Sequence, residues 1–430
     1  MAPPTTSFTT SRINGSTFLI VETDDYGEWP FIYAKQHPTE PILILSDTGC
    51  NAPRDKSVKL SNLREYLETY PIFENGGRPL NPIVKSNDGK GSCEREYVVI
   101  CSHCHYDHIG CIEAFSTTTA QNTTKSFIVA SSHDPDFILK DLPTHSLCRF
   151  KDPPIETPKY SITHWAHDYG KLYADPEQGI YVRGKLPKIQ DVSHLKSLGI
   201  TFLHTPGHTP DSLAWWDEDE RWLYVGDSFY ERQKEDMPII FPAEGNLLHF
   251  FHSMQHLLIF VRSENAAEER RTAERERESK HDFEVLSRRI KVGCAHQTAG
   301  EDAEEMIMAT LRLIMAIVAG KVPVISSKMQ RGEPVDLWRE SKKARFSVLG
   351  PRRLIEDVRD EIERCKREKR PIPLDFNKSV EDIAVPQKLC GPTCQGRVRQ
   401  ERRLNAPRFV MYSSSTTAIS LPGPFAADPR

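Results

Sequence analysis

The chain has 430 residues, of which 38% are hydrophobic and 27% are charged, and its formal net charge is -4. Such a mild charge balance argues against a nucleic-acid-binding or membrane-binding surface, so we expect a small-molecule substrate. The N-terminus has no secretory signal, and the most apolar stretch, Leu311 to Ile325, is too short and too polar to span a bilayer. Ten cysteines without framework spacing are typical of reduced thiols, which predicts a cytoplasmic protein. The oligomeric state stays open.

The first half of the chain alternates between predicted strands and helices. Residues 1–15 are predicted to be loose. Short apolar or β-branched runs then predict strands at Ser16 to Glu22, Phe31 to Lys35, Pro41 to Leu45, Tyr97 to Cys101 and Phe127 to Ala130. Helical patterns lie between them at Leu63 to Tyr70 and Ile109 to Phe115. This alternation favours a layered α/β fold.

The second half begins with a segment of weak periodicity, about residues 141–195, which we expect to be a long irregular insertion. Predicted strands follow at Ile200 to His204, Ser212 to Trp216, Trp222 to Val225 and Arg289 to Cys294. Predicted helices cover Leu247 to Val261 and Ala303 to Ala319, and the charged run Glu264 to Lys280 reads as a solvated helix or loop. Residues 331–370 are expected to form a helical extension and residues 371–430 a largely disordered tail.

Four potential metal ligands follow the buried strand that ends at Cys101. They are His103, His105, Asp107 and His108, within Ser-His-Cys-His-Tyr-Asp-His. Imidazole and carboxylate are ligands that zinc takes, and strand ends are where ligands gather in layered α/β folds. One His-x-His pair would be compatible with a polar loop, but four ligands at this spacing favour a metal site.

Further candidates occur at turns that follow other predicted strands. His208 lies in Thr-Pro-Gly-His-Thr-Pro, Asp227 in Gly-Asp-Ser, and His296 just after the strand that ends at Cys294. A single Asp or His of this kind is more often a cap or a surface residue. Three of them at strand ends, added to the first four, predict a site with enough ligands for two metal ions.

In this order the motifs resemble the signature of the metallo-β-lactamase superfamily over about residues 16–300, and Asp47-Thr48-Gly49 resembles its early Asp turn. The resemblance implies an αββα sandwich for a catalytic domain at residues 16–330, with a C-terminal extension. It implies two zinc ions per chain: His103, His105 and His208 would hold the first, Asp107, His108 and His296 the second, and Asp227 would bridge them. Asp47 would orient a ligand by hydrogen bonding. Redox members tend to carry Glu with iron at the position of His105, so the imidazole favours zinc.

Zinc lowers the pKa of a bound water to about 7, so a metal-bridging hydroxide can attack a carbonyl at neutral pH. Asp107 could protonate the leaving group. Tyr230 stands at the offset at which lactone-opening members place a substrate-binding Tyr, although a core position is an equal alternative. The leading hypothesis is therefore a hydrolase that opens a small lactam or lactone, in detoxification or secondary metabolism.

The alternatives remain an acyl-thioester hydrolase (glyoxalase II-like or of a polyketide pathway), then a nuclease, then a non-catalytic zinc-binding protein. The charge balance argues against the nuclease, and retention of all seven ligand candidates argues against the non-catalytic protein.

Other histidines are less specific candidates. His249, His252 and His256 share one face of a predicted helix, which is the expected polar side of an amphipathic helix, although that helix could border the substrate pocket. His164 and His167 are weaker candidates for lining an opening to the site.

Overall fold

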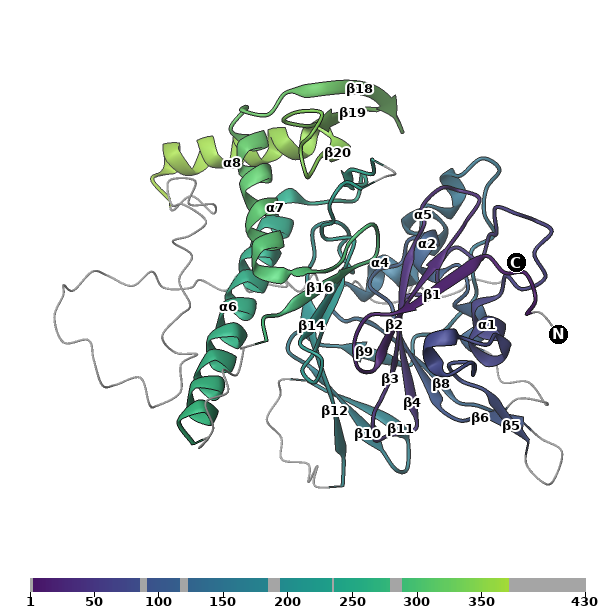
Figure 1. The fold of residues 1–430 in the computed structure, drawn as a ribbon. Helices are drawn as coiled ribbons and strands as arrows, with labels where there is room; N and C mark the ends of the chain where they lie inside the picture. The colour runs from purple at the N-terminus through teal and green to yellow at the C-terminus, as the bar shows by residue number, and fades with distance from the viewer. Residues whose placement is uncertain are drawn as a thin grey trace, which may run out of the picture. The chain divides into compact units, whose positions relative to one another are not determined.

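A computed structural model describes residues 3–85, 91–116, 123–184, 194–233, 236–278 and 288–370. Within these ranges two large β-sheets lie face to face, with helices on the outside (Figure 1). No helix in them is long and apolar enough to cross a membrane. Their eight cysteines are free and buried. The predicted tail, residues 371–430, lies outside the described residues.

The first sheet contains seven strands from the N-terminal part of the chain. In spatial order they are β1 (Phe8–Arg12), β2 (Thr17–Glu22), β3 (Phe31–Gln36), β4 (Ile42–Ser46), β7 (Glu96–Ile100), β8 (Ser126–Ser131) and β9 (His164–Ala166). Strands β4, β7, β8 and β9 pair in parallel. Continuous apolar runs such as Ile-Leu-Ile-Leu in β4 suit this position, because a central parallel strand is covered on both faces.

The second sheet also has seven strands. In spatial order they are β11 (Gly179–Arg183), β10 (Lys171–Asp175), β12 (Lys196–His204), β13 (Leu213–Asp217), β14 (Trp222–Gly226), β16 (Lys291–Cys294) and β17 (Ala299–Asp302). Strands β12, β14 and β16 run in the same direction, so their C-terminal ends meet at one edge of the sheet.

Side chains of the two inner sheet faces form one continuous core. Trp215 stacks on Tyr224 at 3.9 Å between ring centroids, and Tyr33 of the first sheet meets Tyr224 edge-on at 4.7 Å. One ion pair also lies within the sandwich: Lys35 Nζ is 2.8 Å from Asp217 Oδ2, and both side chains are fully buried. The sheets are thus joined by aromatic packing and by one desolvated ion pair.

Helices cover the outer face of each sheet, as the αββα prediction requires. The helices are α1 (Leu63–Thr69), α2 (Tyr106–Ile109), α3 (Glu113–Ser116), α4 (Pro135–Lys140), α5 (Leu142–His145), α6 (Leu247–Glu278), α7 (Ala303–Val318) and α8 (Arg352–Glu368), with single 3-10 turns at Phe73–Asn75 and Cys148–Phe150. Helix α1 packs on the first sheet through Leu63 and Leu67, and α6 and α7 pack on the second through Met254 and Met306. The chain therefore has the predicted fold class.

Two smaller sheets complete the described residues. One pairs β5 (Ile83–Lys85) with β6 (Gly91–Cys93). The other contains, in spatial order, β15 (Ile239–Ile240), β20 (Val348–Pro351), β19 (Glu333–Trp338) and β18 (Val324–Gln330). The expected helical extension at 331–370 thus begins with two strands and becomes helical only at α8. Strand β20 of this extension pairs with β15, about a hundred positions earlier in the chain. Local periodicity cannot reveal such a pairing.

Two other segments differ from expectation, and for the charged run the structure decides between the helix and the loop that the sequence left open. Residues 8–12, expected to be loose, form the edge strand β1, whose polar residues face solvent. The segment 141–195 supplies β9, β10 and β11, which are only three to five residues long: β10 and β11 form a hairpin, β10 also pairs with β12, and β9 pairs with β8. The charged run after Val261 continues α6 as a single helix to Glu278. Short strands and solvated helix turns carry little sequence signal of their own.

Candidate metal centre

All seven predicted ligands lie where strands of the two sheets end. Strand β7 leads into His103, His105, Asp107 and His108, while β12, β14 and β16 lead to His208, Asp227 and His296. Each of these side chains is buried. The sandwich therefore brings residues almost two hundred positions apart to one place, in two groups of potential donor atoms.

The first donor group consists of three imidazoles. Nε2 of His103 lies 2.9 Å from Nδ1 of His105, and Nε2 of His208 lies 3.2 Å from the same atom. The three rings are arranged edge to face, with centroids 4.4 to 4.9 Å apart. Three ring nitrogens thus converge on one point.

The second donor group combines two imidazoles and two carboxylates. Asp107 Oδ2 lies 3.2 Å from Nε2 of His108 and 3.2 Å from Nε2 of His296. Asp227 Oδ1 lies 3.5 Å and 3.4 Å from the same two nitrogens. Four donor atoms therefore surround a second point.

The carboxylate of Asp227 faces both groups. Its Oδ1 belongs to the second group, while its Oδ2 is 4.0 Å from Nε2 of His103 and 3.8 Å from Nε2 of His208. This is the position that the resemblance assigned to a bridging ligand.

The donor atoms fit metal ions by spacing and by burial. With ion-to-ligand distances of about 2.1 Å, a tetrahedral zinc holds its ligands roughly 3.4 Å apart, close to the separations above. In addition, Nε2 of His108, Nε2 of His296 and Oδ1 of Asp227 are buried without a hydrogen-bond partner in the described part of the chain. Buried polar atoms without partners are costly, and a cation at each point would satisfy them.

The outward-facing nitrogens of four histidines are held by other groups. Nδ1 of His108 lies 3.0 Å from Asp47 Oδ2, and Nδ1 of His103 lies 3.1 Å from Ser102 Oγ. Nδ1 of His208 and of His296 can donate to the carbonyl oxygens of Ile240 at 2.7 Å and Glu28 at 2.8 Å. Such contacts fix the tautomer of each ring and direct its other nitrogen inward.

Asp47 occupies a demanding backbone position to make this contact. Its φ is 64°, a left-handed conformation that side chains other than Gly adopt only at some cost. Its carboxylate accepts hydrogen bonds from the Ser102 backbone N–H and from Ser102 Oγ, both at 2.7 Å, besides facing His108. Thr48 Oγ1 donates to the His108 carbonyl oxygen at 2.9 Å. The turn after β4 thus holds the His-rich segment in place.

The two donor groups differ in their electrostatics. Burial and the neighbouring His208 ring lower the pKa of His105 to about 3, so this group consists of neutral imidazoles at pH 7. Burial opposes protonation of His296, but Asp227 and Asp107 outweigh it and raise its pKa to about 10. Burial likewise opposes ionisation of Asp107, but His108 and His296 hold its pKa well below the usual range. The second group therefore keeps both carboxylates ionised.

Tyr230 lies beside the second group. Its ring centroid is 5.5 Å from that of His296, and the residue is only 1% exposed. Its hydroxyl is buried and makes no hydrogen bond of normal geometry in the described ranges. The position is compatible with either of the two interpretations that the sequence left open.

A cavity of about 440 Å³ is lined by residues that neighbour or contact members of both groups, although none of the seven donors lines it. It is lined by Tyr106, next to Asp107, by Glu28, which bonds His296, and by Ile240, which bonds His208. The rest of its wall includes Phe150 and Lys151 from the segment expected to be an insertion, and Arg331 and Val335 from the C-terminal hairpin. Tyr106 was predicted as a pocket wall, and the segments 141–195 and beyond 330 were expected to set specificity, but the individual residues Phe150, Lys151, Arg331 and Val335 were not predicted, because spacing does not reveal which residues of a distant loop border a pocket.

Glu28 and Ser102 are the main site residues that sequence reasoning missed. Ser102 precedes His103 directly, so its position was the available signal. No sequence signal marks Glu28, because its backbone contact with His296 joins residues 268 positions apart.

One family model and one curated protein match parts of the chain. The family model described as "Metallo-beta-lactamase superfamily" matches residues 145–266, which include His208 and Asp227. A curated relative, "Putative transcription factor avaE" from Aspergillus versicolor, is 28% identical over 356 residues, covering 82% of this chain and 89% of the relative.

Solved structures that resemble the chain carry the same family name. The DIM-1 metallo-β-lactamase exposed to ceftazidime has a TM-score of 0.37 at 12% identity, covering 73% of this chain and 98% of that one. A metallo-β-lactamase from Pontibacter korlensis has a TM-score of 0.38 at 14% identity, with coverages of 71% and 98%. The archaeal superfamily protein ST1585 from Sulfolobus tokodaii has a TM-score of 0.36 at 14% identity, with coverages of 67% and 81%.

Proposed function

We propose that the chain is a metal-dependent hydrolase of the metallo-β-lactamase superfamily, whose model matches residues 145–266, and that it uses two zinc ions to open a small cyclic amide or ester. The observation that carries this proposal is the convergence of two buried donor groups that share Asp227. An acyl-thioester hydrolase remains the alternative, because the same kind of site serves all three carbonyl substrates.

The seven donors would divide between the ions as the two groups do. His103, His105 and His208 would hold one ion, Asp107, His108 and His296 the other, and Asp227 would face both. Imidazole and carboxylate suit zinc better than metals that prefer all-oxygen or thiolate ligands. Zinc so held would supply a water of pKa about 7 and a Lewis acid for the carbonyl oxygen.

The chain's own residues would position the substrate and move the proton. Asp107, ionised beside His108 and His296, is the carboxylate that would take up a proton from the attacking water and return it to the leaving nitrogen or oxygen. The Tyr230 hydroxyl, which is buried beside the second group, is proposed to donate a hydrogen bond to the substrate carbonyl. Burial of every donor excludes bulk water from the groups themselves.

The adjoining cavity favours a substrate with an apolar body. Phe150, Phe241 and Val335 form part of its wall, and the cationic lining residues already have partners. Lys151 Nζ donates to Tyr106 Oη at 2.8 Å and lies 3.5 Å from Glu28, while Arg331 pairs with Glu244 at 2.6 Å. A ring of drug-like or metabolite size would fit its volume.

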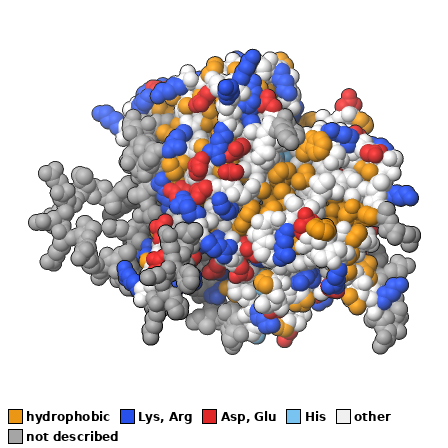
Figure 2. Space-filling view, viewed as in Figure 1, with side chains coloured by type: hydrophobic (Ala, Val, Ile, Leu, Met, Phe, Trp, Pro, Cys, Tyr) orange, Lys and Arg blue, Asp and Glu red, His pale blue; other side chains and the backbone are white. Residues whose placement is uncertain are grey.

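Nucleic acid is a weaker candidate partner, although one relative carries the name of a putative transcription factor. Figure 2 shows Lys and Arg side chains interspersed with Asp and Glu over the upper left of the viewed face, and apolar side chains gathered over its middle and right. Nucleic-acid-binding surfaces instead segregate basic residues into a patch or stripe. The seven retained donors likewise favour a catalytic over a purely regulatory role.

The test is hydrolysis of a panel of lactams, lactones, acyl-thioesters and single-stranded RNA, with zinc measured on the same samples. We expect turnover of a lactam or lactone by the wild type, with about two zinc ions in the two donor groups. Asp107→Ala and His208→Ala should each reduce turnover by several orders of magnitude. Asp136→Ala, an exposed acid on α4, is the matched control and should leave it unchanged.

Thioester turnover alone would select the alternative substrate class. Activity that survives both donor substitutions would place the chemistry elsewhere, and a wild type with less than one zinc after zinc-replete expression would exclude the two-metal proposal.

A further inference from the structure

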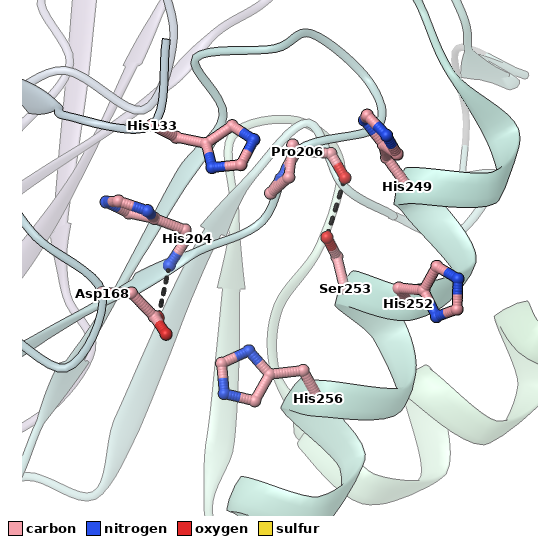
Figure 3. A pocket seen from close by; sticks show the side chains of 8 residues that line it. All are labelled: His133, Asp168, His204, Pro206, His249, His252, Ser253 and His256. Atoms are coloured by element: carbon pink, nitrogen blue, oxygen red, sulfur yellow. Dashed lines mark hydrogen bonds between the residues drawn. The ribbon is translucent and has the colours of Figure 1, made fainter. Parts of the chain in front are cut away.

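A second pocket, separate from the donor groups above, is lined mainly by histidines. It has a volume of about 370 Å³, and Figure 3 shows its lining side chains. They are His133, Asp168, His204, Pro206, His249, His252, Ser253 and His256. Five of the chain's sixteen histidines therefore line one pocket that takes no part in the proposed hydrolysis.

The histidines come from three separate parts of the fold. His133 follows β8 of the first sheet, His204 ends β12 of the second, and the other three lie on α6. On that helix His249 and His252 are three residues apart, and His252 and His256 are four apart, so they share one face. The sequence predicted this face as the polar side of a helix. The structure places it opposite two further imidazoles (Figure 3).

The spacing of His133 and His204 suits a shared ligand. Their ring centroids are 5.6 Å apart at an interplanar angle of 75°. This is close to the 5.5 Å and 90° between His108 and His296, which belong to one donor group of the candidate metal centre. Two imidazoles on one tetrahedral zinc, at about 2.1 Å from each nitrogen, have centroids roughly 5 Å apart.

His204 is also oriented as a ligand would be. Its Nε2 can donate to the Ala166 carbonyl oxygen at 2.7 Å, which leaves Nδ1 with a lone pair. Its backbone N–H donates to Asp168 Oδ1 at 3.1 Å, which places a carboxylate in the same pocket. A ring nitrogen fixed by a backbone carbonyl is the usual arrangement of metal-binding histidines.

Three of the imidazoles in this pocket lie in surroundings that favour their neutral form, which is the form that binds metal. Burial lowers the pKa of His204, although the Ala166 carbonyl and Asp168 partly oppose this shift. Burial and His133 lower the pKa of His249, and burial and His249 lower that of His252. Neutral rings favour a cation over an anion here.

We propose that this pocket binds a divalent transition-metal ion, with zinc as the probe, through His133, His204 and His249. Asp168 supplies negative charge at the same place. His133 and His249 are exposed and can rotate, so the ligands close around the ion on binding. The site is therefore weaker than the two buried donor groups, whose atoms already lie within 4.8 Å of one another.

The pocket also adjoins the turn that carries His208. Ser253 Oγ donates to the Pro206 carbonyl oxygen at 2.7 Å, and a Cβ on Gly207 would lie only 2.3 Å from Phe250 Cα. Helix α6 is thus in direct contact with this turn. An ion that joins α6 to β12 would therefore stabilise the turn that carries His208 without touching His208 itself.

The experiment counts zinc on the full chain by equilibrium dialysis and elemental analysis. We expect wild type to bind about three ions and His133→Ala/His249→Ala about two. Asp107→Ala/His208→Ala, which removes donors of the candidate metal centre, should keep the additional ion. His164→Ala, a partly exposed histidine on β9 outside the pocket, is the matched control and should bind as many ions as wild type.

Equal zinc counts for wild type and His133→Ala/His249→Ala would overturn the site, and so would a wild type that binds only two ions. Circular dichroism of each variant checks the fold, and His133→Gln/His249→Gln repeats the count if the alanine variant is unfolded. Loss of hydrolysis with the additional ion retained would contradict the proposed activity but not this site.

Discussion

The carboxylate of Asp47 lies 3.0 Å from Nδ1 of His108 and also accepts two hydrogen bonds from Ser102. One side chain therefore holds the residue before the His-rich motif and the last histidine within it. It does so from a left-handed backbone position, with a φ of 64°.

We expect Asp47→Ala to weaken zinc binding more than it weakens folding. Loss of a carboxylate that orients a metal-binding histidine typically costs 10- to 100-fold in metal affinity or activity, so a decrease of about that size is expected. Competition with a chromogenic chelator measures the affinity. Asp55→Ala, an exposed acid in the following loop, is the control. Unchanged affinity in Asp47→Ala would mean that His108 is oriented by other contacts.

Tyr230→Phe separates the two interpretations of that residue. If the hydroxyl binds the substrate carbonyl, turnover should fall by about 10- to 1,000-fold, because one donor to a developing oxyanion is lost. The zinc content should stay the same, since the ring still packs against His296. Steady-state kinetics, with zinc analysis on the same sample, distinguishes the two interpretations. Unchanged kinetics would show that Tyr230 only packs in the core.

The buried pair of Lys35 and Asp217 should be sensitive to loss of one partner. Burial already raises the pKa of Asp217, and Lys35 counteracts this. Lys35→Met would leave an uncompensated buried carboxylate, which typically costs about 3–5 kcal/mol in the free energy of unfolding. Urea unfolding at pH 7 measures it.

The double variant Lys35→Met/Asp217→Leu should recover most of that loss, because neither charge remains. Lys140→Met, in an exposed pair with Asp136, should change nothing measurable. If Lys35→Met alone were as stable as wild type, water would have to reach the Asp217 carboxylate.

Glu22 should make stability depend on pH. Burial raises its pKa from 4.5 to about 7, although three backbone N–H groups of residues 50–52 donate to its carboxylate. The folded state therefore binds this proton more tightly than the unfolded state, so the free energy of unfolding falls as the pH rises from about 4.5 to about 7. The cost above pH 7 is at most about 3 kcal/mol.

The difference in unfolding free energy between wild type and Glu22→Gln isolates this group, because other titrations cancel. We expect the wild type to lose stability relative to the variant across that pH range. A difference that does not change with pH would show that Glu22 titrates normally in the folded chain.

The sequence alone was sufficient to identify the ligand candidates and the fold class. His103, His105, Asp107 and His108 lie within six residues after a strongly apolar strand, so both the motif and its support are local signals. His208, Asp227 and His296 each follow a strand with a clear apolar run. Periodicity and local spacing report such features well, because they depend on a few consecutive residues.

Only the tertiary structure decided what surrounds those ligands. The contacts of Glu28 with His296 and of Ile240 with His208, the cavity wall from two distant segments, and the meeting of His133 and His204 with α6 all join residues far apart in the chain. The short strands of segment 141–195 also depended on pairing with β8 and β12, which lie outside the segment. Such contacts are set by how the two sheets pack, and this is a property of the whole chain rather than of any local pattern.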